Sequence, residues 1–248
     1  MKLRVEHLSK AYHNHPVVNL PQATLGDHGL EGLIGPNGAG KSTLMGLLTR
    51  RLSPTTGSIW LEDEEQSHEL NALKSYEVAR LGLVKTNQRI QGFESLKIRD
   101  SLRLAATTHA QETLRGVLDD DPLSEELEEE IDTYLSAFSF ADRDGYALSG
   151  GEKKLLDILR CLVLKPRLLL MDEPTAGLPE DVTEQVMRLV ADKVKAGEMK
   201  VVIVEHDLEL IWSFCEYVHF LSEGEMLFQG APEEVKNNRV VAEKYMGV

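Results

Sequence analysis

The chain has 248 residues, of which 42% are hydrophobic and 27% are charged, and its formal net charge is −14 at pH 7. This length allows one domain with a sizeable core, or one domain with an inserted subdomain. The negative charge argues against a nucleic-acid partner, because DNA and RNA binding depends on Lys and Arg side chains that neutralise phosphates.

No run of residues approaches the roughly 18 apolar residues of a membrane span. The first residues, Met1–Glu6, do not resemble a signal peptide. Cys161 and Cys215 both lie in apolar segments and read as small core residues in a reducing compartment. We therefore expect a cytoplasmic protein that reaches a membrane only through a partner.

Hydrophobic periodicity divides the chain into alternating strands and helices. Strands are predicted at 2–8, 30–34, 57–62, 82–86, 167–172, 200–205, 217–221 and 225–228. Helices are predicted after residue 40 and at 74–81, 180–196, 207–215 and 233–245. This alternation favours a three-layer α/β core with a largely parallel sheet. Between about 97 and 165 the pattern is helical throughout, which indicates a subdomain inserted into the core.

Residues 35–43 read GPNGAGKST and form the most informative segment of the chain. Gly35, Gly40, Lys41 and Ser42 fill the phosphate-loop pattern G-x-x-x-x-G-K-[ST]. Glycines allow the backbone to close around a triphosphate, and the following helix offers N–H groups to an anion. A glycine-rich turn before an ordinary helix is the alternative, but it does not require a preceding buried strand. The expected nucleotide-binding residues are Gly35, Pro36, Asn37, Gly38, Ala39, Gly40, Lys41, Ser42 and Thr43.

The apolar strand at 167–172 ends in two acids, Asp172 and Glu173. Buried strands often end in acids at loops, so this feature alone is ambiguous. With a phosphate loop upstream, Asp172 is a candidate Mg²⁺ ligand together with the Ser42 hydroxyl, since Mg²⁺ prefers oxygen ligands. Glu173 is the next residue, so its side chain should face the side opposite to Asp172. It is a candidate to orient or deprotonate the attacking water.

A second glycine-rich segment, Leu148–Glu152, precedes another predicted helix. Ser149 is a typical N-cap residue, but Gly150 and Gly151 each lower helix stability. A capped helix with a flexible entrance explains the serine and not the glycines. We therefore interpret Ser149, Gly150, Gly151 and Glu152 as a second anion site.

At this point the chain closely resembles the ATP-binding cassette (ABC) ATPases, whose LSGG[QE] signature matches Leu148–Glu152. The resemblance covers residues 2–248 in the motif order of that family. It implies a P-loop NTPase core of about 1–88 and 166–248, with a mostly parallel sheet and an antiparallel N-terminal β subdomain. A helical subdomain of about 89–165 would be inserted into this single ABC domain.

The resemblance also implies roles for further residues. Tyr12 would stack on adenine and Val17 would contact the nucleotide, while Gln88 would reach Mg²⁺ and the attacking water. His206 would contact the γ-phosphate, and Glu173, His206, Gln88 and Lys41 would form the catalytic set. Two subunits would face head to tail, so that the segment Ser149–Glu152 acts on ATP bound by the second subunit, as a homo- or heterodimer.

Within the family the resemblance is to ATPases of branched-chain amino acid uptake, which work on transmembrane permease subunits at the inner face of the cell membrane. Related readings are the urea/amide importers and the lipopolysaccharide-export ATPase. A soluble ABC ATPase of the iron–sulfur assembly type remains the alternative from another class, because Ser149–Lys154 also resembles it. Two residues depart from the family pattern: Pro179 replaces an Asp or Asn, and Asn87 replaces an aromatic residue. Neither the substrate nor the permease is specified by the sequence.

Overall fold

The structure, a computed structural model, describes residues 1–86, 96–106, 125–138 and 148–246. The chain divides into two compact units. The first holds Met1–Thr86, Pro166–Pro174 and Met187–Val248, and the second holds Asn87–Lys165 and Thr175–Val186. None of the helices in the described ranges is long and apolar enough to cross a membrane.

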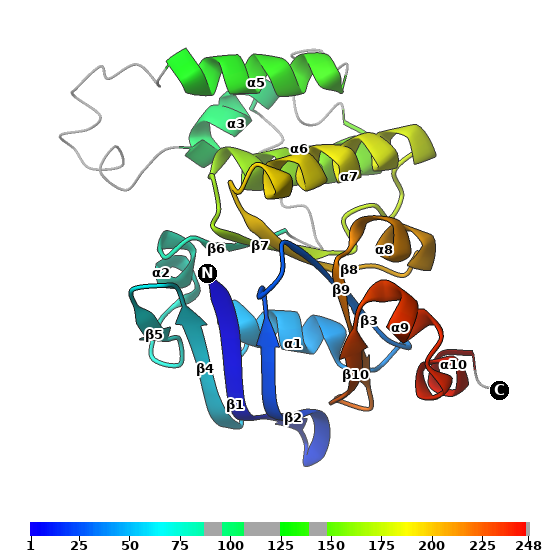
Figure 1. Cartoon of the computed structure of the whole chain (residues 1–248). Coiled ribbons are helices and arrows are strands. Elements are labelled where there is room, and N and C mark those ends of the chain that lie inside the picture. The colour runs from blue at the N-terminus through cyan, green and yellow to red at the C-terminus, as the bar shows by residue number, and fades with distance from the viewer. Residues whose placement is uncertain (87–95, 107–124, 139–147, 247–248) are drawn as a thin grey trace. The chain divides into compact units, whose positions relative to one another are not determined.

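The first unit begins with a four-stranded antiparallel sheet in the order β2-β1-β4-β5 (Figure 1). In the first hairpin, His13 and Asn14 have φ of +50° and +66°, as a tight two-residue turn with matching strand twist requires. Leu3 and Val5 alternate with partly exposed neighbours, so one face of β1 packs on the core. The strands are β1 (Lys2–Tyr12), β2 (His15–Leu25), β4 (Thr56–Glu62) and β5 (Ser67–Glu69).

The second sheet of this unit has six strands in the order β10-β9-β3-β8-β7-β6. Neighbouring strands are parallel, except that β10 runs antiparallel to β9. Every residue of β3 and β7 is buried, as expected for parallel strands covered on both faces. The strands are β3 (Leu30–Ile34), β6 (Leu83–Lys85), β7 (Leu168–Asp172), β8 (Lys200–Val204), β9 (Tyr217–Ser222) and β10 (Glu225–Gly230).

Helix α1 (Lys41–Leu48) lies in the hydrophobic core that the two sheets share. Leu44, Met45, Leu47 and Leu48 are fully buried there, against residues from both sheets. Helix α2 (Ser75–Arg80) contributes Val78 to the same core.

Helix α8 (Leu208–Phe214) packs against β3, because a Cβ on Gly32 would lie 3.0 Å from Ile211 Cγ2. Leu33, the next residue, belongs to the core that contains α1. Because side chains alternate between the two faces of a strand, α8 packs on one face of β3 and α1 on the other. Helix α9 (Pro232–Lys236) contacts β9 and β10, and α10 (Arg239–Met246) follows it.

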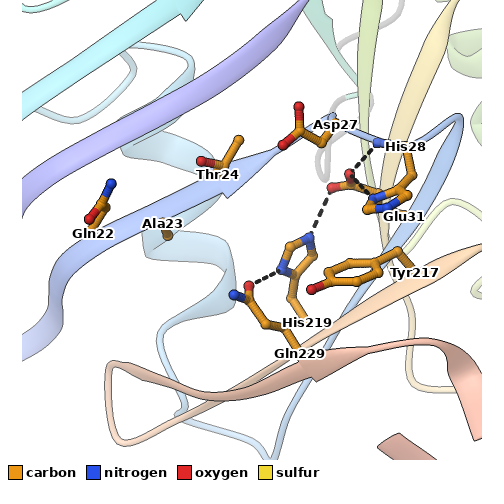
Figure 2. A pocket seen from close by; sticks show the side chains of 9 residues that line it. All are labelled: Gln22, Ala23, Thr24, Asp27, His28, Glu31, Tyr217, His219 and Gln229. Carbon is orange, nitrogen blue, oxygen red and sulfur yellow. Dashed lines mark hydrogen bonds and ion pairs between the residues drawn. The ribbon is translucent and has the colours of Figure 1, made fainter. Parts of the chain in front are cut away.

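A hydrogen-bonded glutamate–histidine pair lies inside the six-stranded sheet, where an apolar pair is expected (Figure 2). Glu31 of β3 and His219 of β9 are 0% and 1% exposed, and Glu31 Oε2 lies 2.9 Å from His219 Nε2. The backbone N–H groups of Gly26 and His28 also donate to the Glu31 carboxylate, at 2.7 and 2.8 Å. His219 Nδ1 lies 3.2 Å from Gln229 Oε1. These hydrogen bonds offset the free-energy cost of burying the Glu31 carboxylate and the His219 imidazole.

The second unit is helical in its described part. Helices α3 (Ile98–Ala106) and α5 (Glu125–Ala137) are joined by charged side chains, since Arg99 and Arg103 both donate to Glu128. Helix α6 (Gly150–Val163) packs on α3, and Arg160 Nε donates to Ser101 Oγ at 2.7 Å. Helix α7 (Glu180–Lys195) begins in this unit.

The mixed α/β architecture and its largely parallel sheet confirm the predicted fold class. The local predictions fail in two ways. Strands β2 and β5 were not predicted at all, and the helix predicted at 233–245 is two helices. The break has a clear cause: Asn238 Oδ1 accepts from the N–H groups of Val240 and Val241, and so caps a new helix.

Candidate active site

The phosphate loop joins the end of β3 to the start of α1, as the sequence predicts (Figure 1). Two glycines are required by close contacts. A Cβ on Gly35 would lie 1.9 Å from the Leu221 carbonyl oxygen, and one on Gly40 would lie 2.6 Å from the Val17 carbonyl oxygen. Gly40 is also the N-cap of α1, with φ of 102°. The loop is thus fitted between β9 and β2.

Lys41, the first residue of α1, folds back over this loop. Its Nζ donates to the carbonyl oxygens of Gly35 and Pro36 at 2.6 and 3.1 Å. Burial lowers the pKa of Lys41, although the nearby carboxylates of Glu173 and Asp172 act in the opposite direction. The two carbonyl oxygens therefore hold the Lys41 ammonium group beside the loop. Anionic phosphate oxygens are stronger acceptors and can replace these carbonyls.

Asp172 ends β7 inside the protein, 1% exposed. Its Oδ2 accepts a hydrogen bond from Lys85 Nζ at 2.9 Å, and its backbone N donates to Thr86 Oγ1 at 3.1 Å. Its Oδ1 is buried without a hydrogen-bond partner. Sequence reasoning missed Lys85 and Thr86 as partners of Asp172. The available signal was a charged and a polar residue, Lys85 and Thr86, at the end of the predicted strand 82–86.

Glu173 follows with φ of +50°, which is a strained conformation for a residue with a side chain. Its N–H donates to the Val204 carbonyl oxygen at 2.8 Å, and this bond holds the residue at the end of β8. Its Oε1 lies 3.0 Å from His206 Nε2, and both side chains are partly exposed. Asp207 caps α8 by accepting from the N–H groups of Glu209 and Leu210, which fixes the segment that carries His206.

Four segments distant in sequence line one cavity of about 210 Å³, and Val17 of β2 is one of them. The phosphate loop forms one wall, the chain after β7 supplies Glu173, and the chain after β8 supplies His206. The lining residues are Val17, Asn37, Gly38, Ala39, Gly40, Lys41, Ser42, Thr43, Glu173 and His206.

This cavity combines a glycine-rich loop, a lysine, a carboxylate and an imidazole, as a nucleotide site does. Comparison with known families shows which family of nucleotide-binding proteins it belongs to. The family described as ABC transporter matches residues 22–176. The chain belongs to the ABC transporter family. Membership gives the chain its biochemical activity: it is an ATP-binding subunit that hydrolyses ATP.

Individual relatives of this ABC protein agree with the assignment. The high-affinity branched-chain amino acid transport ATP-binding protein BraF of Pseudomonas aeruginosa is 32% identical over 222 residues, covering 87% of this chain and 86% of the relative. The lipopolysaccharide export system ATP-binding protein LptB of Acidithiobacillus ferridurans is 30% identical over 249 residues, covering 99% and 96%. The crystal structure of a nucleotide-free ATP-binding cassette from an ABC transporter superposes with a TM-score of 0.80 at 25% identity over the whole of both chains.

Asp172 does not line the cavity, but it offers a ligand for the Mg²⁺ ion that would accompany the nucleotide. The unpartnered Oδ1 of Asp172 is a buried carboxylate oxygen, the kind of ligand that this ion prefers. In the described part of the chain, no group of three or more His, Cys, Asp or Glu could hold a metal ion. Further ligands would therefore come from the Ser42 hydroxyl, phosphate oxygens and water, as is usual for Mg²⁺ in NTPases.

The signature segment lies in the second unit and forms the N-terminus of α6. Ser149 caps the helix by accepting from Glu152 N at 3.2 Å, and the Glu152 carboxylate accepts from Ser149 N at 2.8 Å. A Cβ on Gly151 would lie 2.9 Å from the Gly177 carbonyl oxygen, which explains one glycine. Gly150 has open space around it, so an approaching group could reach its backbone.

Among the predicted nucleotide and metal ligands that the structure describes in the first unit, Tyr12, Gly35, Pro36 and Asp172 do not line the cavity. Tyr12 is 41% exposed at the end of β1 and does not line the cavity, and Lys10 Nζ lies 5.1 Å from the centre of its ring. Gln88 lies outside the described residues, as does Asn87. Cys161 and Cys215 are both buried and form no disulfide bond.

Proposed function

We propose that this ABC subunit is the motor of a membrane transporter. In this role it hydrolyses ATP with Mg²⁺ at the phosphate-loop cavity and transmits the resulting change to a permease. The observation that carries the proposal is the convergence of Lys41, Glu173 and His206 on one cavity beside the loop. These groups supply a cation, a carboxylate and an imidazole, which phosphoryl transfer to water needs.

The residues have separate roles in nucleotide binding. Gly35–Thr43 surround the phosphates with backbone N–H groups, and Lys41 exchanges the carbonyls of Gly35 and Pro36 for phosphate oxygens. Val17 borders the nucleotide, and Tyr12 stacks on adenine once the ring leaves Lys10. Ser42, Asp172 and Gln88 would hold Mg²⁺, and this ion would offset negative charge on the phosphates.

Glu173 orients or deprotonates the attacking water, and His206 contacts the γ-phosphate. The His206 imidazole and the Glu173 carboxylate are joined by a hydrogen bond of 3.0 Å. While His206 is bonded to Glu173, one carboxylate oxygen is occupied. A phosphate that attracts the imidazole releases that oxygen for water, so hydrolysis begins only when the γ-phosphate is in place.

The second anion site acts in trans. Ser149, Gly150, Gly151 and Glu152 stand at the N-terminus of α6, which offers N–H groups and the positive end of a helix dipole. In a head-to-tail dimer this segment closes over ATP bound by the other subunit. ATP thereby holds the dimer together, and hydrolysis releases it.

The experiment that tests this function replaces Glu173 by Gln, which keeps the shape and removes the base. ATP should still bind and hold a dimer, while turnover falls by about 100-fold or more. Lys41→Ala should instead weaken ATP binding itself. Affinity, sedimentation and turnover are measured for both variants, with Glu69→Gln as an exposed control. Near-normal turnover of Glu173→Gln would reject the assignment.

The transported substrate is proposed to be an amino acid of the branched-chain type, taken up through a permease at the inner face of the cell membrane. The likeness to BraF supports this choice. The likeness to LptB covers more of both chains and supports lipopolysaccharide export as the second candidate. Identifying the permease that co-purifies with the tagged subunit from membranes separates the two candidates, and recovery of no membrane partner favours an iron–sulfur assembly role.

A further inference from the structure

Lys85 ends β6 directly beside Asp172 at the end of β7. The Nζ atom of Lys85 lies 2.9 Å from Oδ2 of Asp172, and the two side chains are 7% and 1% exposed. A buried ammonium group is stable only when a nearby carboxylate compensates its charge. Lys85 therefore neutralises the acid that is proposed to hold the metal.

The two oxygens of this carboxylate differ in their surroundings. Oδ2 is bonded to Lys85, whereas Oδ1 is buried without a partner. The main chain is fixed as well. The Thr86 hydroxyl oxygen accepts from Asp172 N at 3.1 Å, and the Thr86 backbone N donates to the Leu170 carbonyl oxygen at 3.0 Å. The end of β6 thus holds both the backbone and one side-chain oxygen of Asp172, and leaves the other oxygen for a ligand.

We propose that Lys85 is a positioning residue that makes binding of a divalent cation depend on nucleotide. The inference rests on the proposed role of Asp172 as a metal ligand. A cation at Oδ1 shares its carboxylate with the Lys85 ammonium group, and at an effective dielectric constant of about 20 their repulsion is several times the thermal energy. The negative charges of a nucleotide offset this repulsion, so the ion and the nucleotide enter together.

A purely structural ion pair makes a different prediction. Loss of Lys85 would then lower stability, and would change metal binding to the same extent with and without nucleotide. The distinguishing quantity is the coupling factor, which is the Kd of the metal without nucleotide divided by its Kd with nucleotide.

The test uses Lys85→Gln, which can still donate a hydrogen bond to Asp172 but has no charge. Binding of Mn²⁺ is followed by electron paramagnetic resonance, with and without a non-hydrolysable ATP analogue. Mn²⁺ alone should bind about tenfold more tightly than to the wild type, and the coupling factor should fall about tenfold. Lys85→Arg keeps the charge and should keep the coupling.

The matched control is Lys200→Gln, because Lys200 Nζ donates to the carbonyl oxygens of Gly26 and Asp27. This variant should leave the coupling factor unchanged. Lys85→Met provides a second neutral variant with a stem of similar length. An unchanged coupling factor in the neutral variants, or failure of both to fold, would overturn the proposal. A wild type that binds neither the analogue nor Mn²⁺ with the analogue would contradict the proposed function of the cavity instead.

Discussion

Glu31 is an acid at the second position of a strand that is otherwise apolar, and its environment makes it a charged core residue. Burial by itself raises the pKa of Glu31, but the hydrogen bonds from His219, His28 and Gly26 outweigh it, so the pKa lies below its ordinary value. Figure 2 shows the carboxylate pointing at His219, with the stacked rings of His28 and Tyr217 beside it. This cluster borders a cavity of about 370 Å³ in the first unit, separate from the residues that line the nucleotide cavity.

Replacement of Glu31 by Gln should destabilise the protein at pH 7 by about 3 kcal/mol, because it leaves His219 without its charged partner. A depressed folded-state pKa gives stability that is fully present above the ordinary value of 4.5. That stability is lost as the pH falls through the lower folded-state pKa. Urea denaturation should therefore show the two proteins converging in free energy of unfolding as the pH drops below about 4.5.

The control is Glu225→Gln, which removes an exposed carboxylate that accepts one hydrogen bond from Asn19. It should cost less than about 1 kcal/mol at pH 7. A difference for Glu31→Gln that stays constant from pH 7 to pH 3 would show that the pair contributes through packing and not through charge.

At the scale of elements, the phosphate loop is shaped by its neighbours as much as by its own sequence. Leu221 of β9 presents its carbonyl oxygen to Gly35, and Gly224, just after β9, donates to the Ala39 carbonyl oxygen at 3.0 Å. The turn between β9 and β10 also contacts β2, since the Gly224 carbonyl oxygen accepts a hydrogen bond from Asn19 N at 2.8 Å. The loop therefore depends on a hairpin that is almost 190 positions away in the sequence.

Gly35→Ala and Gly38→Ala form a matched pair that tests this dependence. At Gly38 an added Cβ meets no atom within 4 Å, so the cost should be the positive φ of 82° alone, about 1 kcal/mol. At Gly35 the Cβ would collide with the Leu221 carbonyl oxygen, so β9 or the loop must move. Gly35→Ala should cost at least about 2 kcal/mol more and weaken ATP binding by at least about tenfold. Equal thermal stability of the two variants would contradict the contact.

Much of this element structure could be predicted, because the phosphate loop and the acidic end of β7 are short-range patterns. Strand β2 could not, since Pro16 and Pro21 interrupt its pattern. The structure places β2 at the edge of its sheet, where proline is tolerated. The pairs Lys85–Asp172 and Glu31–His219 were equally hidden, because each joins two strands far apart in the sequence and depends on their register. The role of Gln88 stays a prediction.

At the scale of the whole molecule, the two motifs that touch ATP in the proposal belong to different units of the chain. Lys41 lies in the first unit and Ser149 in the second. In the proposed dimer each complete site takes Lys41 and Glu173 from one subunit and Ser149 from its partner. Mixing subunits with different lesions can therefore restore one site.

A mixture of Lys41→Ala and Ser149→Arg subunits should be more active than either variant alone. Half of the dimers in an equal mixture carry one intact site, so the activity should approach roughly a quarter of the wild-type rate. The control mixes Lys41→Ala with Glu173→Gln, whose lesions affect both sites of every dimer and should give no recovery. Subunit exchange is verified with two affinity tags. No recovery in the first mixture counts against the head-to-tail arrangement.

The position of β3 between β8 and β9 also determines when the protein can become functional during its synthesis. Leu30 pairs with Val201, and Ile34 pairs with Phe220, so both neighbours of β3 are translated about 170 positions later. At about 5–20 residues per second, a ribosome needs roughly 10–35 s to cover that distance. During this interval the nascent chain carries the phosphate-loop sequence without the strands that shape it. The emerging N-terminal half therefore has no complete phosphate site for ATP to stabilise, and both edges of β3 stay unpaired until roughly the last fifth of the chain has been translated.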